Sequence, residues 1–374
     1  SRTGARPQPG AVRTIPTSVL AASSVFNDPT FWTTFSAARF GPAVRPFVVA
    51  LAITAVVVFP VRWLAFRLGA VAEPGGRRIH QRPTPLLGGL AMYIGFGLAA
   101  ALFSTNSKTE GLLLAAAVVT ALMVLDDRGG LSPTIKLAIQ VLASLIAVVL
   151  FGIEINFVGL PGVVHLAPAV SIALSLLWFV GLQNTINLID GVDGLAAGVV
   201  AIVAAAVLLA AINLSRPDVV ILAGCLIGAC IGFLVFNWHP ARIFMGDTGS
   251  NFLGFTLAAL SVLSTAKVAV VLSLIVPVLA LTIPFLDTGW AILRRRGRGQ
   301  SIATPDAEHL HHRLLDYGLS PRETALVFYF GTAIFAALGL AIYGHKKVLL
   351  GAITLLVLGI VVILGRRFRR ISRG

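Results

Sequence analysis

Charged residues are scarce in this chain. Of its 374 residues only 12% are Asp, Glu, Lys or Arg, and the acidic ones number 15. An average soluble domain carries about 25% charged residues, so this composition excludes an ordinary soluble protein. Hydrophobic residues make up 57% of the chain, and its mean hydropathy is +0.92. The sequence therefore predicts a polytopic membrane protein of the all-α class.

Cysteine is also nearly absent. Cys225 and Cys230 lie in one apolar run with no ligand residue nearby, which favours buried free thiols and leaves the redox compartment open. The net charge of +14 is also typical of nucleic-acid binding, but Lys and Arg in short loops are the residues that orient a membrane protein. We therefore expect membrane lipid around the protein and no nucleic-acid partner.

The first 40 residues lack an apolar run long enough to span a bilayer. They are rich in Ala, Ser, Thr, Pro and Arg and show no apolar core followed by a cleavage site, so no signal peptide is predicted. We expect residues 1–40 to be an extracytoplasmic segment, partly disordered or an interfacial helix. Residues 41–370 are expected to form a single transmembrane domain.

Apolar runs dominate the rest of the chain. A spanning helix needs about 20 apolar residues, and the sequence offers about eleven candidate spans. They are roughly 45–70, 86–104, 111–126, 134–151, 168–189, 194–213, 218–237, 249–265, 268–292, 323–343 and 347–365. The segment 153–167 alternates in polarity and contains a Pro-Gly turn, which predicts a small β-hairpin on one membrane face.

Basic residues predict the orientation of these spans. The face that the chain reaches after the first span carries 19 Lys and Arg residues, and the opposite face carries 5. The 19 are Arg62, Arg67, Arg77, Arg78, Arg82, Arg128, Lys136, Arg242, Arg294, Arg295, Arg296, Arg298, Arg313, Arg322, Arg366, Arg367, Arg369, Arg370 and Arg373; the 5 are Lys108, Arg216, Lys267, Lys346 and Lys347. Because basic loops stay inside, the first face is expected to be cytoplasmic, with the C-terminus inside and the hairpin outside.

Four polar segments interrupt the apolar runs, and all of them fall on the expected cytoplasmic face. They are Asp126-Asp127-Arg128, Asn184 to Gly194, Asn237 to Asp247, and His309 to His312. Burying such groups in hydrocarbon costs several kcal/mol each unless they have partners or water. Their common position therefore indicates one cytoplasmic-face site for a charged ligand or a metal.

The acidic segments are better explained as parts of a functional site than as ordinary helix ends. Two acids at the C-terminus of a helix oppose its macrodipole, and adjacent positions point about 100° apart, so Asp126 and Asp127 need not share a partner. Asn184, Asn187 and Asp190 recur every three residues and form one helical stripe, after which glycines let the chain turn. A calcium loop is excluded because its acids would lie two apart. A polar helix–helix contact is the alternative.

The third segment carries oxygen ligands beside an aromatic residue. Asp247 and the amides near it suit a hard cation such as Mg²⁺, with Mn²⁺ as an alternative. Phe244 lies three residues before Asp247 and is a candidate stacking surface for a base, or else a core aromatic that anchors the loop.

The histidine segment lies in a basic loop, 293–321. His309, His311 and His312 lack a fourth zinc ligand at suitable spacing, and the arginines around them favour phosphate over zinc. Asp287 lies inside the ninth candidate span, where it is either a site acid or the partner of a nearby base. Several acids, a hard metal and many cations at a membrane face suit phosphate transfer that involves a lipid.

These motifs resemble the polyprenyl-phosphate N-acetylhexosamine-1-phosphate transferases, a glycosyltransferase family 4 type that includes the phospho-MurNAc-pentapeptide translocase. The matching stretches run in family order: Arg78 to Gly89, Leu125 to Asp127 with Lys136, Asn184 to Gly194, Phe236 to Ser250, Pro284 to Thr288, and His309 to Leu314. The Glu-His-Leu-His-His-Arg pattern and eleven spans resemble the bacterial branch that uses UDP-GlcNAc.

The resemblance implies an activity and its partners. It implies transfer of GlcNAc-1-phosphate from UDP-GlcNAc to undecaprenyl or decaprenyl phosphate in the bacterial inner membrane, with release of UMP. The product would start a cell-envelope polymer such as lipopolysaccharide, teichoic acid or arabinogalactan. Members of the family often dimerise.

The resemblance also implies roles for individual residues. Asp247 and Asn187 would bind Mg²⁺, Lys136 would contact phosphate, and Asp126 and Asp127 would lie by the lipid phosphate as catalytic groups together with Asp247. The residues implied for the nucleotide sugar are Phe244, Asp193, Asn184, Asp190, His309, His311, His312, Arg313 and Arg82.

Two other functions are alternatives. UDP-MurNAc-pentapeptide is the alternative donor. An ion-coupled transporter is less favoured, because transporters often show repeated halves and coupling sites near the midplane. This chain shows no internal repeat, and its acids gather at one face.

Overall fold

The computed structural model describes residues 37–73, 83–159, 163–264, 289–290, 292–294, 296 and 320–342. Within these ranges the protein is mostly helical. Its long helices are α3 (Ala37–Leu68), α4 (Gly88–Phe103), α5 (Ser107–Gly129), α6 (Pro133–Leu145) continued by the π-helical turn η2 (Ile146–Leu150), α7 (Pro168–Ile189), α8 (Leu195–Asn213), α9 (Pro217–Asn237), α10 (Gly246–Leu263) and α14 (Pro321–Ile342).

These helices coincide with nine of the predicted spans. An apolar span is helical because a backbone in hydrocarbon must satisfy its hydrogen bonds internally. Among the described residues six helices are long and apolar enough to cross a membrane. They are Phe40–Leu68, Ser107–Gly129, Pro133–Leu150, Pro168–Ile189, Leu195–Asn213 and Pro217–Asn237. The segment 1–36, nearly all of the predicted span 268–292, and the span 347–365 lie outside the described residues.

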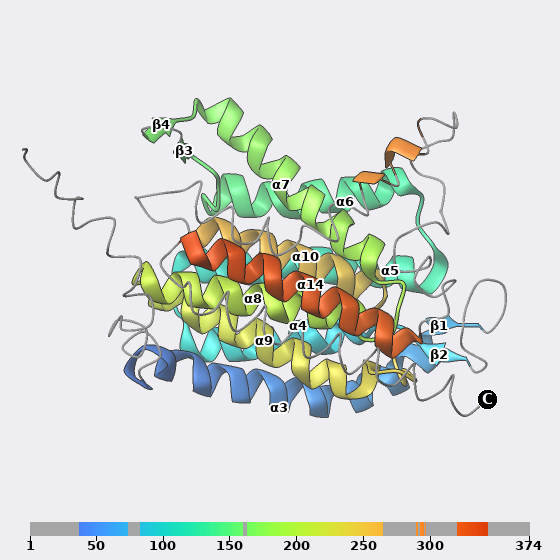
Figure 1. The fold of residues 1–374 in the computed structure, drawn as a ribbon. Helices are drawn as coiled ribbons and strands as arrows, with labels where there is room; N and C mark the ends of the chain where they lie inside the picture. Colours follow the sequence, from blue (N-terminus) through green and yellow to red (C-terminus); the bar gives the residue numbers. More distant parts are fainter. Residues whose placement is uncertain are drawn as a thin grey trace, which may run out of the picture.

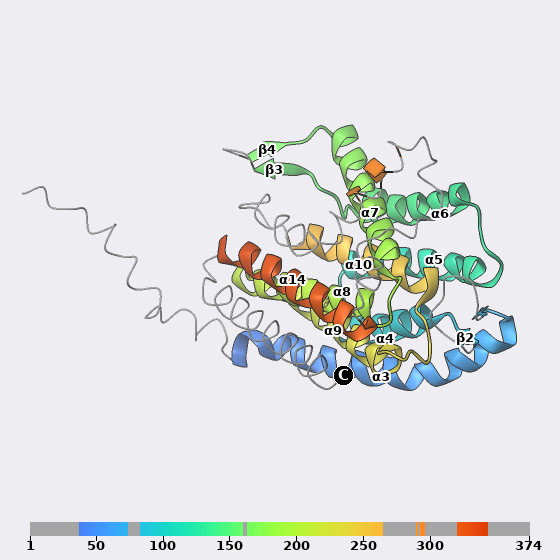
Figure 2. The same ribbon diagram turned by 45° about the vertical axis from the view of Figure 1, so that its right-hand side comes forward.

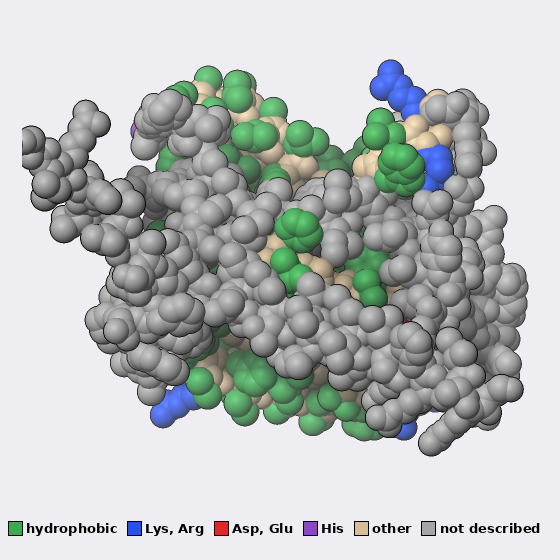
Figure 3. All heavy atoms as spheres, in the orientation of Figure 1, with side chains coloured by type: hydrophobic (Ala, Val, Ile, Leu, Met, Phe, Trp, Pro, Cys, Tyr) green, Lys and Arg blue, Asp and Glu red, His purple; other side chains and the backbone are tan. Residues whose placement is uncertain are grey.

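The bundle has two distinct ends. Strands β1 (Val71–Ala72) and β2 (Thr84–Pro85) pair antiparallel at one end, and β3 (Phe157–Gly159) and β4 (Val163–His165) pair antiparallel at the other (Figures 1 and 2). The second pair lies within the predicted hairpin segment 153–167. Figure 3 shows apolar side chains along the upper and lower flanks and Lys and Arg side chains toward the ends, as expected of a bundle with lipid around its middle.

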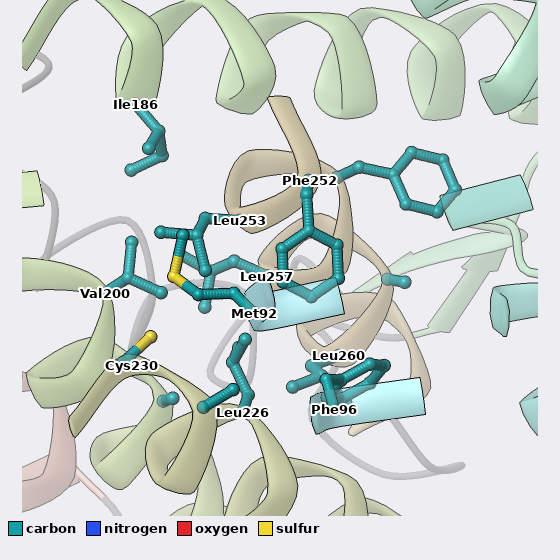
Figure 4. Packing of buried hydrophobic residues seen from close by; sticks show 14 of the residues in the cluster. Met92, Phe96, Ile186, Val200, Leu226, Cys230, Phe252, Leu253, Leu257 and Leu260 are labelled. Carbon is teal, nitrogen blue, oxygen red and sulfur yellow. The ribbon is translucent and has the colours of Figure 1, made fainter. Parts of the chain in front are cut away.

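Helix α10 forms the centre of the bundle. Every residue from Thr248 to Leu263 is buried, and α4, α5 and α7 all pack against it. Figure 4 shows Phe252, Leu253 and Leu257 of α10 among side chains from its neighbours. Because α10 meets protein rather than lipid, it carries small and polar residues that would be costly on a lipid-facing helix. This explains why its sequence is less apolar than that of other spans.

Helices α3 and α9 approach each other closely along a stripe of glycines. Gly224, Gly228 and Gly232 recur every four residues on α9, and a β-carbon at each would press against a backbone carbonyl of α3. Small residues at this spacing let two membrane helices bring their backbones together. The stripe therefore fixes the long helix α3 against the core.

Candidate active site

A cavity of about 600 Å³ opens at the β1–β2 end of the bundle. Its lining comes from loops and helix ends that are far apart in the sequence. The residues that line it are Val71, Ala72, Leu86, Asp126, Asp127, Asn187, Asp190, Gly191, Val192, Asp193, Asn237, His239, Phe244, Gly246, Asp247 and Pro321. Three of the four predicted polar segments thus meet in one cavity, and the fourth, His309 to His312, lies outside the described residues.

Asp127 closes the N-terminus of α10. Its carboxylate accepts hydrogen bonds from the backbone N–H groups of Asp247 at 2.8 Å and Thr248 at 3.1 Å. The residue that precedes the helix, Met245, supplies no side-chain cap, so an acid from α5 satisfies two N–H groups that the helix itself leaves unpaired. A carboxylate at this position also interacts favourably with the helix dipole.

Gly246 makes this contact possible. Its φ is +69°, in the left-handed region that favours glycine, and a β-carbon there would overlap the carboxylate of Asp127. Glycine at position 246 is therefore required by the geometry of the cap, independently of any chemistry of the Asp247 side chain.

Lys136 joins two carboxylates. Its Nζ lies 2.6 Å from Asp126 Oδ2 and 2.5 Å from Asp247 Oδ2, so one ammonium group bridges the end of α5 and the start of α10. The other oxygen of Asp126 accepts from the backbone N–H of Leu131 at 2.5 Å. Asp126 and Asp127 thus have separate partners, as their 100° offset on the helix predicts.

Asn187 holds Asp247 from the opposite side. Its Nδ2 donates to Asp247 Oδ1 at 2.8 Å and to Ser250 Oγ at 2.9 Å. Below this contact, Gln140 of α6 donates to Asn251 Oδ1 and accepts from Asn184 Nδ2, each at 2.8 Å. A polar brace, buried at Gln140 and Asn251 and exposed at Asn184, therefore links α6, α7 and α10 one helical turn inside the acids.

The carboxylates of Asp126, Asp127 and Asp247 form a candidate metal site. One oxygen of each lies within 4.8 Å of the others. Oxygen-only donors at this density fit a hard cation such as Mg²⁺, and the Lys136 ammonium between two of them already marks a place where positive charge is stabilised. Asn187 remains a predicted ligand.

Asp190 lies at the end of α7 and lines the same cavity. Burial raises the pKa of its carboxyl well above the ordinary value, and the nearby charges of Asp247, Asp127 and Asp193 raise it further. A group in this setting favours either a proton or a bound cation, which is consistent with a site that gathers positive charge.

Phe244 is fixed through its backbone. Its N–H donates to Pro85 O and its carbonyl accepts from Gly88 N, both at 2.9 Å. The strand β2 and the start of α4 therefore hold the residue at the cavity wall, where its ring was predicted to stack on a base.

Asp193 and Asn237 organise two neighbouring loops. Asp193 Oδ2 contacts His239 Nδ1 at 2.7 Å and accepts from Ala241 N at 3.0 Å. Asn237 accepts from Gly194 N and donates to Ile243 O, each at 2.9 Å. These side chains tie the loop after α7 to the loop after α9, and Asp193 lines the cavity; its contact with a nucleotide stays a prediction.

The structure separates the predicted site residues into three groups. Asp126, Asp127, Lys136, Asn187, Asp190, Asp193, Phe244 and Asp247 meet at or beside the cavity. Asn184 makes the alternative contact, a polar link between helices α7 and α6, and does not line the cavity. Arg82, Asp287, His309, His311, His312 and Arg313 lie outside the described residues.

Sequence reasoning missed Gln140, His239 and Arg322 as parts of the site. Gln140 lies four residues after Lys136, a spacing that places both on one helix face. That spacing was a usable signal for Gln140. The contacts of His239 and Arg322 join segments that only the fold brings together.

Comparison with known proteins identifies the family. Residues 110–265 match the family described as "Glycosyl transferase family 4". The chain is 38% identical over 295 residues, 78% of this chain and 82% of the relative, to the "Probable undecaprenyl-phosphate N-acetylglucosaminyl 1-phosphate transferase" of Bacillus subtilis (strain 168). It is 38% identical over 310 residues, 74% of this chain and 76% of the relative, to the "Decaprenyl-phosphate N-acetylglucosaminephosphotransferase" of Mycobacterium tuberculosis (strain ATCC 25618 / H37Rv).

A more distant relative comes from the other branch. The "Phospho-N-acetylmuramoyl-pentapeptide-transferase" of Moorella thermoacetica (strain ATCC 39073 / JCM 9320) is 33% identical over 323 residues, which cover 79% of this chain and 96% of the relative. Identity of this extent to membrane transferases of both kinds confirms the resemblance seen in the sequence motifs. The chain belongs to glycosyl transferase family 4.

Proposed function

We propose that this protein transfers GlcNAc-1-phosphate from UDP-GlcNAc to a polyprenyl phosphate and releases UMP. The observation that carries the proposal is the convergence of Asp126, Asp127 and Asp247 at one end of an apolar bundle, with Lys136 bridging Asp126 and Asp247. The greater identity to the two GlcNAc-phosphate transferases than to the pentapeptide transferase supports UDP-GlcNAc as the donor.

The reaction needs little covalent help from the protein. A phosphate monoester is largely dianionic at pH 7, so the lipid phosphate is already a nucleophile. One of its oxygens forms a bond to the sugar-bearing phosphorus while the bond from that phosphorus to the UMP oxygen breaks. Catalysis then rests on positioning and on stabilising the charge of the transferred group. A covalent aspartyl intermediate is the alternative mechanism.

Individual residues of the cavity divide this work. Asp126, Asp127 and Asp247 would hold Mg²⁺ together with Asn187, and the bound ion would offset charge on the diphosphate. Lys136 would contact phosphate. Phe244 would stack on uracil, with Asp190 and Asp193 beside it.

The histidine segment is proposed to complete the donor site. Helix α14 begins at Pro321, which lines the cavity. Arg313 lies eight positions before Pro321, and eight residues reach at most about 28 Å when fully extended. His309, His311, His312 and Arg313 are proposed to contact the phosphates of the nucleotide sugar, and Arg82 is proposed to reach the nucleotide.

The proposed topology places the cavity in the cytoplasm. Helices α10 and α14 both have their N-terminus at the cavity end of the bundle. The chain must therefore cross back to that end between them, which supports the proposed span at 268–292 and the count of eleven spans. Arg62, Arg67, Arg128 and Arg242 belong to the basic face of the sequence, and the positive-inside rule makes that face cytoplasmic. The β3–β4 hairpin would then be extracytoplasmic.

A UMP-release assay tests the function. The purified protein is incubated with UDP-GlcNAc or UDP-MurNAc-pentapeptide, with and without polyprenyl phosphate, and with Mg²⁺, Mn²⁺ or a chelator. We expect UMP only with UDP-GlcNAc, acceptor and divalent ion together. Release with the pentapeptide donor alone would assign the other branch, and a burst of UMP without acceptor would favour the covalent mechanism.

A further inference from the structure

His239 forms part of the cavity wall and is held through its ring. Its Nδ1 lies 2.7 Å from Asp193 Oδ2, where it donates to a carboxylate whose side chain is only 4% exposed, whereas the His239 side chain is 27% exposed. The same carboxylate oxygen accepts from Ala241 N at 3.0 Å. Asp193 therefore orients the imidazole and also fixes the turn of the loop that carries it.

A second anchor holds His239 through its backbone. Arg322 of α14 donates from Nε and Nη2 to the carbonyl oxygen of His239, at 2.9 and 2.7 Å. The planar guanidinium makes both contacts in one rigid geometry, which an ammonium group cannot reproduce. Farther along α14, Tyr329 donates to Gly194 O at 2.5 Å, next to Asp193 in the chain.

These contacts tie three separate segments to one wall of the cavity. The loop after α7 supplies Asp193, the loop after α9 supplies His239, and the first turn of α14 supplies Arg322. Fixing both the carbonyl and the ring leaves His239 little freedom in either its backbone or its side-chain torsions. A side chain with this support suits a role in positioning a ligand.

We propose that His239 is a positioning residue for the nucleotide part of the donor, held for that role by Asp193 and Arg322. The inference rests on the proposed function and adds a determinant of donor affinity to it. In this arrangement Asp193 acts through His239.

The location favours the donor over the lipid acceptor. Three exposed apolar residues, Leu125, Ile135 and Leu137, are sequence neighbours of Asp126 and Lys136 on α5 and α6. That flank suits a prenyl chain that arrives from the bilayer. His239 belongs instead to the contacts that join the loops after α7 and α9 to α14, and it lies in the same loop as Phe244.

Steady-state kinetics of single variants test the proposal. His239→Gln, Asp193→Asn and Arg322→Lys are each expected to raise KM for UDP-GlcNAc about tenfold, the usual effect of losing a hydrogen bond to a charged or well-placed group. The kcat value and the KM for polyprenyl phosphate should stay within about threefold of wild type. Arg216→Lys is the matched control, because α9 has 21 residues and Arg216 lies at its far end, about 30 Å away.

A double-variant cycle separates the proposed route from a direct one. If Asp193 acts through His239, the variant with both Asp193→Asn and His239→Gln has the KM of the worse single variant. Multiplied effects on KM would mean that Asp193 contacts the donor independently and would overturn the proposal. Unchanged KM in His239→Gln, or a loss confined to kcat, would overturn it as well.

Unfolding temperatures of the variants show whether a change in KM comes from a loss of stability. Arg322→Lys changes an exposed contact and is expected to unfold at the wild-type temperature. A KM effect in that variant therefore reports positioning. If wild-type protein releases no UMP from UDP-GlcNAc, the proposed function fails; if it does and the variants behave like wild type, only the role of His239 fails.

Discussion

Replacing Asp247 by Asn removes one charge at the centre of the acid cluster. Its two oxygens have different partners: Oδ2 accepts from Lys136 Nζ at 2.5 Å and Oδ1 accepts from Asn187 Nδ2 at 2.8 Å. The amide of an asparagine presents one oxygen and one NH₂ group. Whichever way it turns, the NH₂ group faces a donor, so one of the two contacts is lost.

The expected cost differs between stability and catalysis. Lys136 keeps Asp126 as a partner, and both members of the lost pair are partly exposed, with side chains 32% and 23% accessible. Solvent screening therefore limits the loss of folding free energy to about 1 kcal/mol. Removing a charged group that acts on the transferred phosphoryl group costs far more, about 3–4 kcal/mol in the barrier, or a factor of 10²–10³ in kcat.

The assay measures UMP release and thermal unfolding of Asp247→Asn side by side. We expect turnover to fall at least about a hundredfold at saturating Mg²⁺, with an unfolding temperature close to that of wild type. Asp218→Asn is the matched control, since Asp218 pairs with Arg216 at the other end of α9 and should leave turnover unchanged. Turnover of Asp247→Asn within about threefold of wild type would refute the assignment of a catalytic charge to this residue.

Three further predictions concern the same structure. Asp127→Asn leaves one N–H of α10 facing an NH₂ group, so it should lose about 2 kcal/mol of stability as well as turnover, measured by thermal unfolding and UMP release. Gly246→Ala adds a β-carbon that overlaps Asp127, so it should be more damaging than Gly69→Ala, where φ is +72° but no atom lies within 4 Å; equal losses in unfolding temperature would contradict the overlap. Cys225 is buried and forms no disulfide, so a maleimide should label it only after denaturation. Rapid labelling of the folded protein would contradict the packing of α9.

The helical ranges could be predicted because each span must form its own backbone hydrogen bonds. The sequence could not show which span lies in the middle. Helix α10 reads as a marginal span, with Ser250 and Asn251 near its start, and only its contacts with α4, α5 and α7 show that protein surrounds it on all sides.

The polar stripe of α7 shows the limit of spacing arguments. Residues three apart on a helix differ by 300°, so each step drifts by 60° around the axis. Asn184 and Asp190 are two steps apart and therefore point about 120° away from each other. Asn187 and Asp190 reach the cavity, while Asn184 turns toward Gln140 of α6.

The role of Asp127 as a cap on α10 could not be predicted from the sequence, for another reason. The sequence predicts it as an acid near the lipid phosphate, and the structure places it in the lining of the cavity. Its hydrogen bond to the N–H of Asp247 joins residues 120 positions apart, and a cap of this kind leaves no local pattern. Such long-range contacts explain why motif residues could be named while their physical tasks could not.

The seclusion of α10 has a consequence for how the bilayer acts on this protein. Asp247 is carried by a helix that touches no acyl chains along its buried length, whereas Lys136 sits on α6, which exposes Ile135, Leu137 and Leu142. A thicker or thinner membrane tilts the helices that it wets. A change in membrane thickness therefore acts on α6, which carries Lys136, through direct lipid contact, and reaches Asp247 on α10 only through the helices packed around it.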